Sequence, residues 1–197
     1  MDNKINTEII EHINSLVTDC TKSENNNVIH ITRFETPIGQ MYASATEAGI
    51  CMLEFTDRKM LATELKELMK HNNAKFIAGD SFYFSEIEKE LTKYFKGELH
   101  NFNVKLDAPG SPFQKRVWNK LQKITFGKTI SYKQLAVSLN SPDSVRAVAN
   151  ANGRNRISII IPCHRVIGED GSLTGYGGGL HRKKWLLDFE STQNKLF

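Results

Sequence analysis

Apolar positions follow a helical period near the start of the chain and a strand period soon afterwards. The stretch TEIIEHINSLVT (7–18) predicts a short N-terminal helix, which the polar TKSENNN (21–27) ends. Three alternating stretches then predict strands separated by TPIG and TEAG turns. These strands are VIHITRF (28–34), QMYASAT (40–46) and GICMLEF (49–55).

Two amphipathic stretches complete the first half of the chain. RKMLATELKELMK (58–70) and FSEIEKELTKYFKG (84–97) predict helices, and the second ends at a glycine suited to a helix C-terminus. A small sheet with helices, an α+β unit, is therefore expected over residues 1–107. The polar, proline-containing NFNVKLDAPGSP marks the break, and a second domain is expected over residues 108–197.

The second half is predicted to be mainly helical, with serines in cap positions. Ser111 and Ser141 each precede a proline, and Ser131 precedes a tyrosine. The expected helices are FQKRVWNKLQKI (113–124), YKQLAVSLN (132–140), DSVRAVANAN (143–152) and GLHRKKWLLDFE (179–190). The short connection between the second and third predicts a helix-turn-helix. The apolar ISIII (157–161) predicts a buried strand.

Charge is divided unevenly between the two halves. Residues 1–107 hold 12 basic and 17 acidic side chains, a net of −5, whereas residues 108–197 hold 14 basic and 5 acidic, a net of +9. A basic half is typical of proteins that bind a polyanion such as nucleic acid, although a solvated lysine-rich surface would give the same count.

Composition excludes several classes of protein. Hydrophobic residues make up 40% and charged residues 24% of the 197 residues, as in globular proteins that are not bound to membranes. No stretch approaches the roughly 18 apolar residues of a membrane span, and the N-terminus does not resemble a secretory signal. Three cysteines do not form a disulfide framework, so a reducing, cytoplasmic location is expected.

The stretch from Pro142 to Asn152 carries small side chains along a helix. Apart from Arg146, the side chains of RAVANAN are short, so the helix backbone can approach another surface closely. In a DNA-binding protein this arrangement suits phosphate contact by backbone amides and insertion of one arginine into the duplex. Tight packing of the alanines against a neighbouring helix is the alternative.

The sequence IIIPCHRVIG sets a thiol beside an imidazole and a guanidinium. Pro162 is expected to end the preceding strand, which leaves Cys163 at its mouth, and His164 and Arg165 are expected to favour the thiolate. Consecutive residues of a strand face opposite ways, so Cys163 and His164 can cooperate only if the chain turns or a water bridges them. A buried filler cysteine and a Cys–His hydrolase are the alternatives. The cysteines and histidines lack zinc-ligand spacing, so no metal is expected.

These residues resemble a known family. IPCHRVIG is similar to the active-site motif of the O6-alkylguanine-DNA alkyltransferases, also called methylated-DNA–protein-cysteine methyltransferases. FQKRVWNKLQKITFGKTISYKQLA, VRAVANANGRN and IPCHRVIGEDGSLTGYGGGLHRKKWLLDFE match in order and spacing, over nearly all of residues 111–190. The first half matches more loosely, through TPIGQMYASATEAGICMLEF. The resemblance implies a ribonuclease H-like N-terminal domain and a winged-helix-like C-terminal domain.

The resemblance implies a single-turnover DNA repair enzyme. Cys163 would accept an alkyl group from O6-alkylguanine, with O4-alkylthymine as a further candidate substrate. His164 would deprotonate the thiol through a water, and Glu190 would hold the other nitrogen of His164. Asn155 would brace the active-site turn, and Tyr132 would donate a hydrogen bond to the departing guanine.

The resemblance also implies a DNA surface and a substrate pocket. Arg146 would fill the gap left by a nucleotide that is flipped out of the minor-groove side of double-stranded DNA. The expected DNA-binding residues are Tyr132, Arg146, Ala147, Ala149, Asn150, Ala151 and Arg154. The expected pocket residues are Val166, Tyr176, Gly177, Gly178 and Lys183. A monomer without a cofactor and without membrane contact is implied.

Two positions depart from the family pattern. Arg156 follows Asn155 where the family usually has proline, and Ala149 stands where glycine is expected. The first could loosen the turn that holds Asn155, and the second could reduce backbone approach to DNA. A DNA-binding protein without transfer chemistry is the alternative to a transferase. Relatives of that kind carry tryptophan in place of Cys163, so the cysteine argues against this alternative.

Overall fold

The computed structural model describes residues 3–17 and 27–193. The polar break of TKSENNN lies almost entirely outside the described residues. The chain forms two compact units, one of residues 1–95 and 103–109 and the other of residues 96–102 and 110–197.

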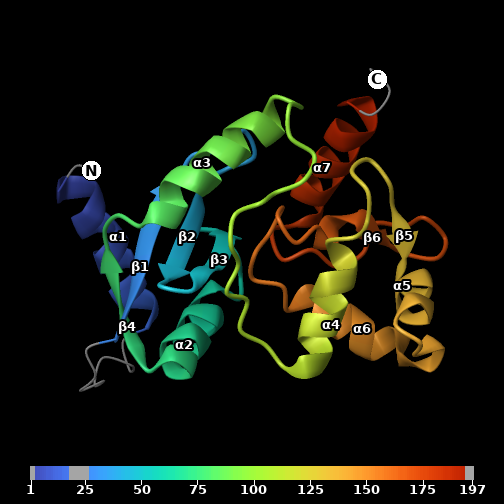
Figure 1. Cartoon of the computed structure of the whole chain (residues 1–197), viewed down its shortest axis with the longest axis horizontal. Helices are drawn as coiled ribbons and strands as arrows, with labels where there is room; N and C mark the ends of the chain where they lie inside the picture. Colours follow the sequence, from blue (N-terminus) through green and yellow to red (C-terminus); the bar gives the residue numbers. More distant parts are fainter. Residues whose placement is uncertain (1–2, 18–26, 194–197) are drawn as a thin grey trace. The chain divides into compact units, whose positions relative to one another are not determined.

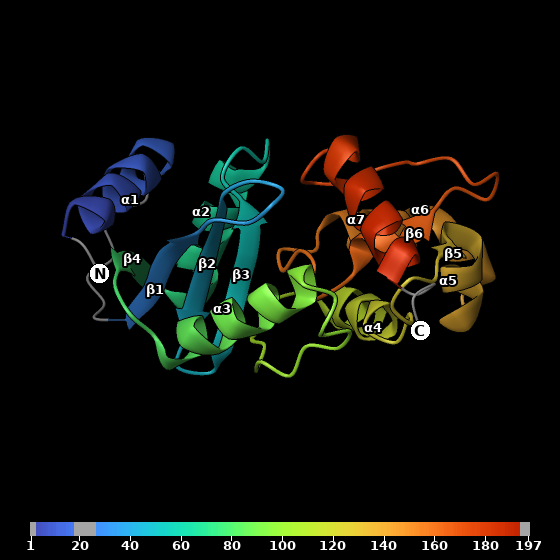
Figure 2. The ribbon, with the colours of Figure 1, turned by 90° about the horizontal axis from the view of Figure 1, so that it is seen from above.

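The first unit is a four-stranded sheet with helices on both faces (Figures 1 and 2). Strands β1 (Asn27–Phe34), β2 (Met41–Thr46) and β3 (Gly49–Phe55) are antiparallel neighbours, and β4 (Ala74–Ala78) pairs in parallel with β1, in the order β3-β2-β1-β4. The register pairs His30 with Ala45, and Met41 with Phe55. The short strand β4, AKFIA, was not predicted from the sequence.

Helices α1 (Asn3–Leu16) and α2 (Leu61–Asn72) cover one face of this sheet. Ile9 and Ile13 of α1 pack into a core with Ile29 and Ile31 of β1 and with the leucines of α2. On the other face, α3 (Phe82–Phe95) sets Phe84 edge-on to Phe34, with ring centroids 6.3 Å apart. The helices expected in this half are thus confirmed.

The segment after residue 102 returns along β3 and fixes a glycine there. Ile50 N–H donates to the Lys105 carbonyl at 2.9 Å, and Asp107 N–H donates to the Ile50 carbonyl at 2.8 Å. Gly49 has φ of 149°, and a Cβ there would lie 2.6 Å from the Lys105 carbonyl oxygen. A side chain at this position would therefore clash with the returning backbone.

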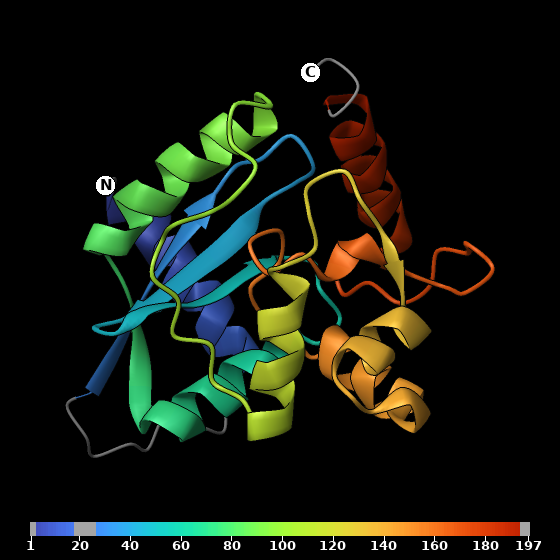
Figure 3. The ribbon, with the colours of Figure 1, turned by 45° about the vertical axis from the view of Figure 1, so that its right-hand side comes forward.

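The second unit is mainly helical (Figure 3). Its elements are α4 (Pro112–Leu121), β5 (Ile130–Ser131), α5 (Tyr132–Ser138), the 3₁₀ turn η1 (Pro142–Ser144), α6 (Val145–Gly153), the 3₁₀ turn η2 (Cys163–Arg165), β6 (Val166–Ile167) and α7 (Leu180–Gln193). β5 and β6 form a two-stranded parallel sheet. Helices α4, α5 and α6 pack on one another, and the Trp118 indole N–H donates to the Ala151 carbonyl at 2.9 Å. The expected α+β fold class is confirmed.

Two of the three predicted serine caps are confirmed. Ser111 and Ser131 each form a complete capping box, with Gln114 and Gln134 as the returning side chains. Ser141 makes no side-chain cap hydrogen bond, and the proline after it starts the 3₁₀ turn η1 instead of α6. Ser141 thus occupies the cap position of the 3₁₀ turn that precedes α6, but it does not cap through its side chain.

The prediction of a strand at residues 157–161 was also wrong. These residues form buried turns, and Ile159 adopts the left-handed region with φ of 72°. All four isoleucines are buried, at most 6% exposed, and burial accounts for an apolar side chain at each of these positions. A short buried apolar run does not distinguish a strand from a turn.

Candidate active site

Cys163 opens the turn η2 at the end of the buried isoleucine run. Its amide donates to the Ile161 carbonyl at 2.7 Å, and the Arg165 amide donates to the Pro162 carbonyl at 3.0 Å. The Cys163 residue is 5% exposed. The 3₁₀ turn removes the alternation of a strand, so Cys163 and His164 are not forced onto opposite faces.

The side-chain amide of Asn155 holds the turn and contacts the thiol. Its nitrogen donates to Cys163 Sγ at 3.1 Å and to the Ile161 carbonyl at 2.8 Å, while its oxygen accepts from the Ile157 amide at 3.0 Å. An N–H donor on sulfur stabilises the thiolate relative to the thiol. Arg156, the departure from the family pattern, leaves these hydrogen bonds of Asn155 in place.

His164 is fully buried and is held by Glu190 of α7. The imidazole Nε2 lies 2.9 Å from Glu190 Oε1, across 26 positions of sequence. The other ring nitrogen, Nδ1, is buried and has no hydrogen-bond partner within residues 3–17 and 27–193. Since Nε2 faces the carboxylate, the proton belongs on Nε2, and Nδ1 is left as a base.

Arg165 anchors the same carboxylate from the other side. Its Nε donates to Glu190 Oε2 at 2.8 Å, one terminal nitrogen donates to Oε1 at 2.9 Å, and the other donates to the Ile124 carbonyl at 2.6 Å. The Gly127 amide donates to Glu190 Oε2 at 3.1 Å and so adds a fourth hydrogen bond to the carboxylate as a whole. Arg165 was predicted to lie near the sulfur and favour the thiolate; its charge is engaged by Glu190.

The electrostatics of this cluster favour a neutral imidazole and an ionised carboxylate. Burial lowers the pKa of His164 below its ordinary value, although the Glu190 carboxylate acts in the opposite direction. Burial by itself would raise the pKa of Glu190, but the hydrogen bonds and charge supplied by His164 and Arg165 hold that pKa below its ordinary range. His164 is therefore free to accept a proton at neutral pH.

Lys183 and Tyr132 meet at one backbone carbonyl. Lys183 Nζ donates to the Val166 and Thr174 carbonyls, both at 2.6 Å, and Tyr132 Oη donates to the Thr174 carbonyl at 3.3 Å. Burial lowers the pKa of Lys183 to about 8, although the nearby Cys163 opposes this shift. Burial also raises the pKa of Tyr132, so its phenol keeps its proton at neutral pH and can donate it.

The other expected pocket residues follow the thiol along the chain. The Tyr176 ring lies 6.4 Å from the His164 ring, centroid to centroid, at 82°. Val166 and Gly178 are buried, and Gly177 is exposed. The Val166 amide donates to the Cys163 carbonyl. The backbone from Cys163 to Val166 is thus fixed by hydrogen bonds at both of its ends.

The expected DNA-binding residues of α6 divide by exposure. Arg146, Ala147 and Asn150 are exposed, and Ala149 is partly exposed. Arg154, just beyond the helix, is also partly exposed. Ala151 is only 2% exposed and its carbonyl accepts from the Trp118 indole, so a contact between this residue and DNA stays a prediction. Its position in the sequence did not reveal which side of the short helix faces the core.

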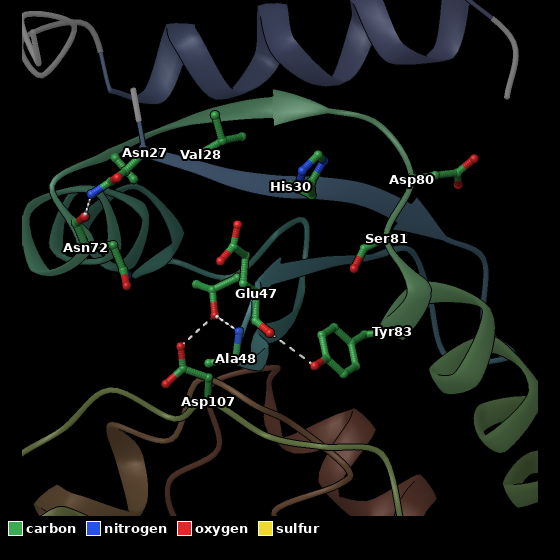
Figure 4. Close-up of a pocket in the computed structure, with 12 residues that line it drawn as sticks. Asn27, Val28, His30, Glu47, Ala48, Asn72, Asp80, Ser81, Tyr83 and Asp107 are labelled. Atoms are coloured by element: carbon green, nitrogen blue, oxygen red, sulfur yellow. Dashed lines mark hydrogen bonds between the residues drawn. The ribbon is translucent and has the colours of Figure 1, made fainter. Parts of the chain in front are cut away.

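A separate hollow lies in the first unit (Figure 4). It has a volume of about 630 Å³, and its lining includes Glu47, Asp80 and Asp107. Tyr83 Oη donates to the Glu47 carbonyl at 3.2 Å, and Thr46 Oγ1 donates to Asp107 at 2.7 Å. Within the part of the chain that the structure describes, no group of three acidic, histidine or cysteine side chains could hold a metal ion. None of the described residues that line it is a cysteine.

The family models match both units of the chain. The DNA-binding domain of 6-O-methylguanine DNA methyltransferase matches residues 112–192, and the ribonuclease-like domain of the same family matches residues 29–108. These matches define the class to which the fold and the cysteine site belong.

Full-length relatives give the same result. Methylated-DNA–protein-cysteine methyltransferase of Methanosarcina barkeri is 44% identical over 156 residues, which cover 79% of this chain and 93% of the relative. The Mycobacterium tuberculosis H37Rv protein of the same name is 42% identical over 166 residues, covering 84% and 94%. The chain belongs to the methylated-DNA–protein-cysteine methyltransferase family, and the resemblance seen in the sequence is confirmed.

Solved structures show a similar fold. The crystal structure of Mycobacterium tuberculosis O6-methylguanine methyltransferase superposes with a TM-score of 0.72 at 38% identity, covering 84% of this chain and 94% of that one. A structure of Mycobacterium tuberculosis OGT in complex with DNA gives 0.70 at 36% identity, with the same coverage. Helix α1 precedes the matched family regions, which begin at residue 29. In the described ranges, no helix is long and apolar enough to cross a membrane.

Proposed function

We propose that this protein repairs DNA by transferring an alkyl group from O6-alkylguanine to Cys163, once per molecule. The observation that carries the proposal is the hydrogen bond from Asn155 to Cys163 Sγ, beside an imidazole that Glu190 holds by its far nitrogen. The Asn155 amide can thus stabilise the Cys163 thiolate, and the neutral imidazole of the next residue, His164, can accept the proton of the thiol. The relatives at about 40% identity are named for the same transfer.

The reaction is a displacement at an sp³ carbon. A water relays the Cys163 proton to His164 Nδ1, and the thiolate then attacks the alkyl carbon. A carbon–sulfur bond forms, the carbon–O6 bond breaks, and guanine leaves with the electron pair. The Tyr132 phenol stabilises the leaving guanine by donating a hydrogen bond. The departing guanine anion takes up one proton, which balances the proton that the Cys163 thiol gave to His164, and neutral guanine is released. The thioether has no internal route to hydrolysis, so the protein acts once.

Helices α5 and α6 are proposed to act as a helix-turn-helix on the minor-groove side of double-stranded DNA. The exposed face of α6 offers small side chains and one long cation, Arg146, which replaces the nucleotide that flips into the pocket. Ala147, Ala149 and Asn150 lie at the backbone of the duplex, with Arg154 beyond them. The pocket is proposed to be formed by Val166, Tyr176, Gly177, Gly178 and Lys183. O4-alkylthymine is a further candidate substrate.

The protein is further proposed to act as a monomer. It is proposed to act in the cytoplasm, because that compartment is reducing and the acceptor Cys163 must remain a free thiol. The domain boundary is proposed at residues 107 and 108, after the segment that pairs with Ile50.

The deciding experiment is a transfer assay with DNA carrying a labelled O6-methyl group. Transfer of label to protein, one per molecule, supports the proposal. Binding without label would indicate a non-transferring DNA-binding protein, and hydrolysis of small esters alone would indicate a Cys–His hydrolase.

A further inference from the structure

A groove in the second unit carries only basic charged groups. It has a volume of about 340 Å³ and lies between α4 and the turn that follows α5. Its polar lining consists of Arg116, Asn119, Lys120, Lys123, Ser138 and Asn140. The three cations are spaced four and three residues apart, so they follow one side of α4 and the turn just beyond it. This feature is called the α4 groove below.

The cations of the α4 groove are available to a ligand. Arg116 and Lys123 are exposed and Lys120 is partly exposed. None of the three forms an ion pair with a carboxylate within residues 3–17 and 27–193. The Arg116 guanidinium lies over the Phe113 ring, 5.6 Å from its centroid, a cation–π contact that does not use the N–H donors.

The opposite wall of the groove lies at the C-terminal end of α5, where free backbone carbonyls would repel an anion. Several of these carbonyls instead accept hydrogen bonds from the turn that follows the helix. The Ala136 carbonyl accepts from the Leu139 and Ser141 amides at 3.1 and 3.0 Å, and the Val137 carbonyl accepts from the Asn140 amide at 2.9 Å. Ser138 Oγ donates to the Leu135 carbonyl at 2.7 Å. The negative end of α5 is therefore largely neutralised within the turn itself.

We infer that the α4 groove binds phosphates of the DNA backbone, in the same duplex that lies on α6. This inference rests on the proposed function, because it takes DNA as the ligand. The wall from Ser138 to Asn140 is followed along the chain by Ser141, η1 and then α6, so only a few residues separate the groove from Arg146 in sequence. A guanidinium binds two phosphate oxygens at once, and two ammonium groups add point charges. The α4 groove thereby extends the interface beyond the segment that α6 contacts.

The test compares two variants that lose the same charge. The groove variant combines Arg116→Gln, Lys120→Gln and Lys123→Gln. The control combines Lys70→Gln, Lys89→Gln and Lys93→Gln, which are exposed cations of α2 and α3 in the first unit. Affinity for undamaged duplex DNA is measured by fluorescence anisotropy at about 50 to 200 mM salt, with protein and duplex at equal concentration.

The groove variant should bind more weakly than wild type and with a lower dependence on salt. Each phosphate contact contributes about 0.9 to the slope of log affinity against log salt, so a loss of about two contacts lowers the slope by about 1.8. The affinity ratio between wild type and the groove variant then shrinks about tenfold across that salt range. The control should keep the wild-type slope. Equal slopes for the groove variant and the control would overturn the inference.

Two further arms keep the test decisive. Lys123→Gln alone, at an exposed position, should lower the slope by about one and guards against misfolding of the triple variant. If the slope differs only when duplex is in excess over protein, the groove holds a second duplex, and the assignment to the same duplex is wrong. Transfer of label from DNA carrying an O6-methyl group to wild-type protein reports the proposed function separately. Failure of that transfer with a normal slope difference would refute the transferase and leave the groove standing.

Discussion

Arg165 binds both carboxylate oxygens of Glu190, at 2.8 and 2.9 Å, and His164 shares one of them. One carboxylate thus serves two consecutive residues of the turn η2. Because Glu190 belongs to α7, this cluster also fastens the last helix to the turn that carries Cys163. The arrangement separates two roles: Arg165 keeps Glu190 ionised and in place, and Glu190 fixes the tautomer of His164.

Glu190→Gln should slow alkyl transfer by roughly ten- to a thousand-fold, which is less than the roughly hundred- to ten-thousand-fold contribution of a general base, because the base His164 remains and only the residue that holds it is changed. The amide keeps the size of the side chain but loses the charge that favours an imidazole with its proton on Nε2. The measurement is the rate of Cys163 modification by a small alkylating reagent across pH, in both proteins. Coinciding pH profiles and equal repair rates would mean that Glu190 has no part in the reaction.

Arg165→Lys is the matched variant, and it should lower stability more than reactivity. A lysine cannot reproduce the two-pronged contact, and weakening one partner of a buried ion pair costs up to about 3 kcal/mol. The His164–Glu190 hydrogen bond remains possible, so transfer should stay within about tenfold of wild type. Urea denaturation gives the stability and a transfer assay gives the rate. A transfer loss as large as that of Glu190→Gln would contradict this division of roles.

The free energy of unfolding should fall as the pH is lowered, over a pH range set by the pKa of His164. Its pKa is lowered in the folded state, so below the ordinary value of about 6.5 the unfolded chain binds a proton that the folded chain does not. Stability is therefore fully present above that pH and declines as the pH falls below it. Glu190 adds a further loss at lower pH, because its folded pKa is also depressed. Urea denaturation between about pH 8 and 5 should show the decline, with His164→Asn giving a flatter profile. A wild-type profile that is flat or rises toward acid would refute it.

Arg146→Ala should slow the repair of duplex DNA by at least about tenfold, since a flipped nucleotide leaves an unstacking cost of a few kcal/mol to be offset. Reaction with a free O6-alkylguanine base needs no flipping and should change little. Lys93→Ala, which removes an exposed cation from α3, is the control and should leave both rates unchanged. Equal losses on duplex and free base would show that Arg146 supports the pocket instead.

The sequence was most informative where one local interaction decides the structure. Ser111 and Ser131 each need only a glutamine three residues later to start a helix, and both capping boxes form. The strand β4 was missed because AKFIA is short, and its place beside β1 depends on contacts far apart in sequence. The run of isoleucines before Pro162 predicts a strand, but a buried turn needs the same apolar composition, and residues 158–160 form such a turn.

The candidate site was predictable in its members more than in its connections. Cys163, His164 and Asn155 lie in one stretch, and the resemblance to a known family added Glu190 from the last helix. Arg165 was seen beside the thiol, but its partnership with Glu190 depends on the turn η2 and on the docking of α7. The adjacency of His164 and Arg165 was the available signal, because a shared anion can satisfy both.

Intact-protein mass after reaction with DNA that contains O6-methylguanine tests the central claim most directly. Wild-type protein should gain one methyl group per molecule, and peptide mapping should place it on Cys163. Cys163→Ala should gain none while its affinity for DNA stays within a few-fold, since the thiol is buried and adds little to a DNA surface. A methyl group on Cys163→Ala, at Cys51 or Cys20, or an unchanged mass for the wild-type protein, would contradict the account.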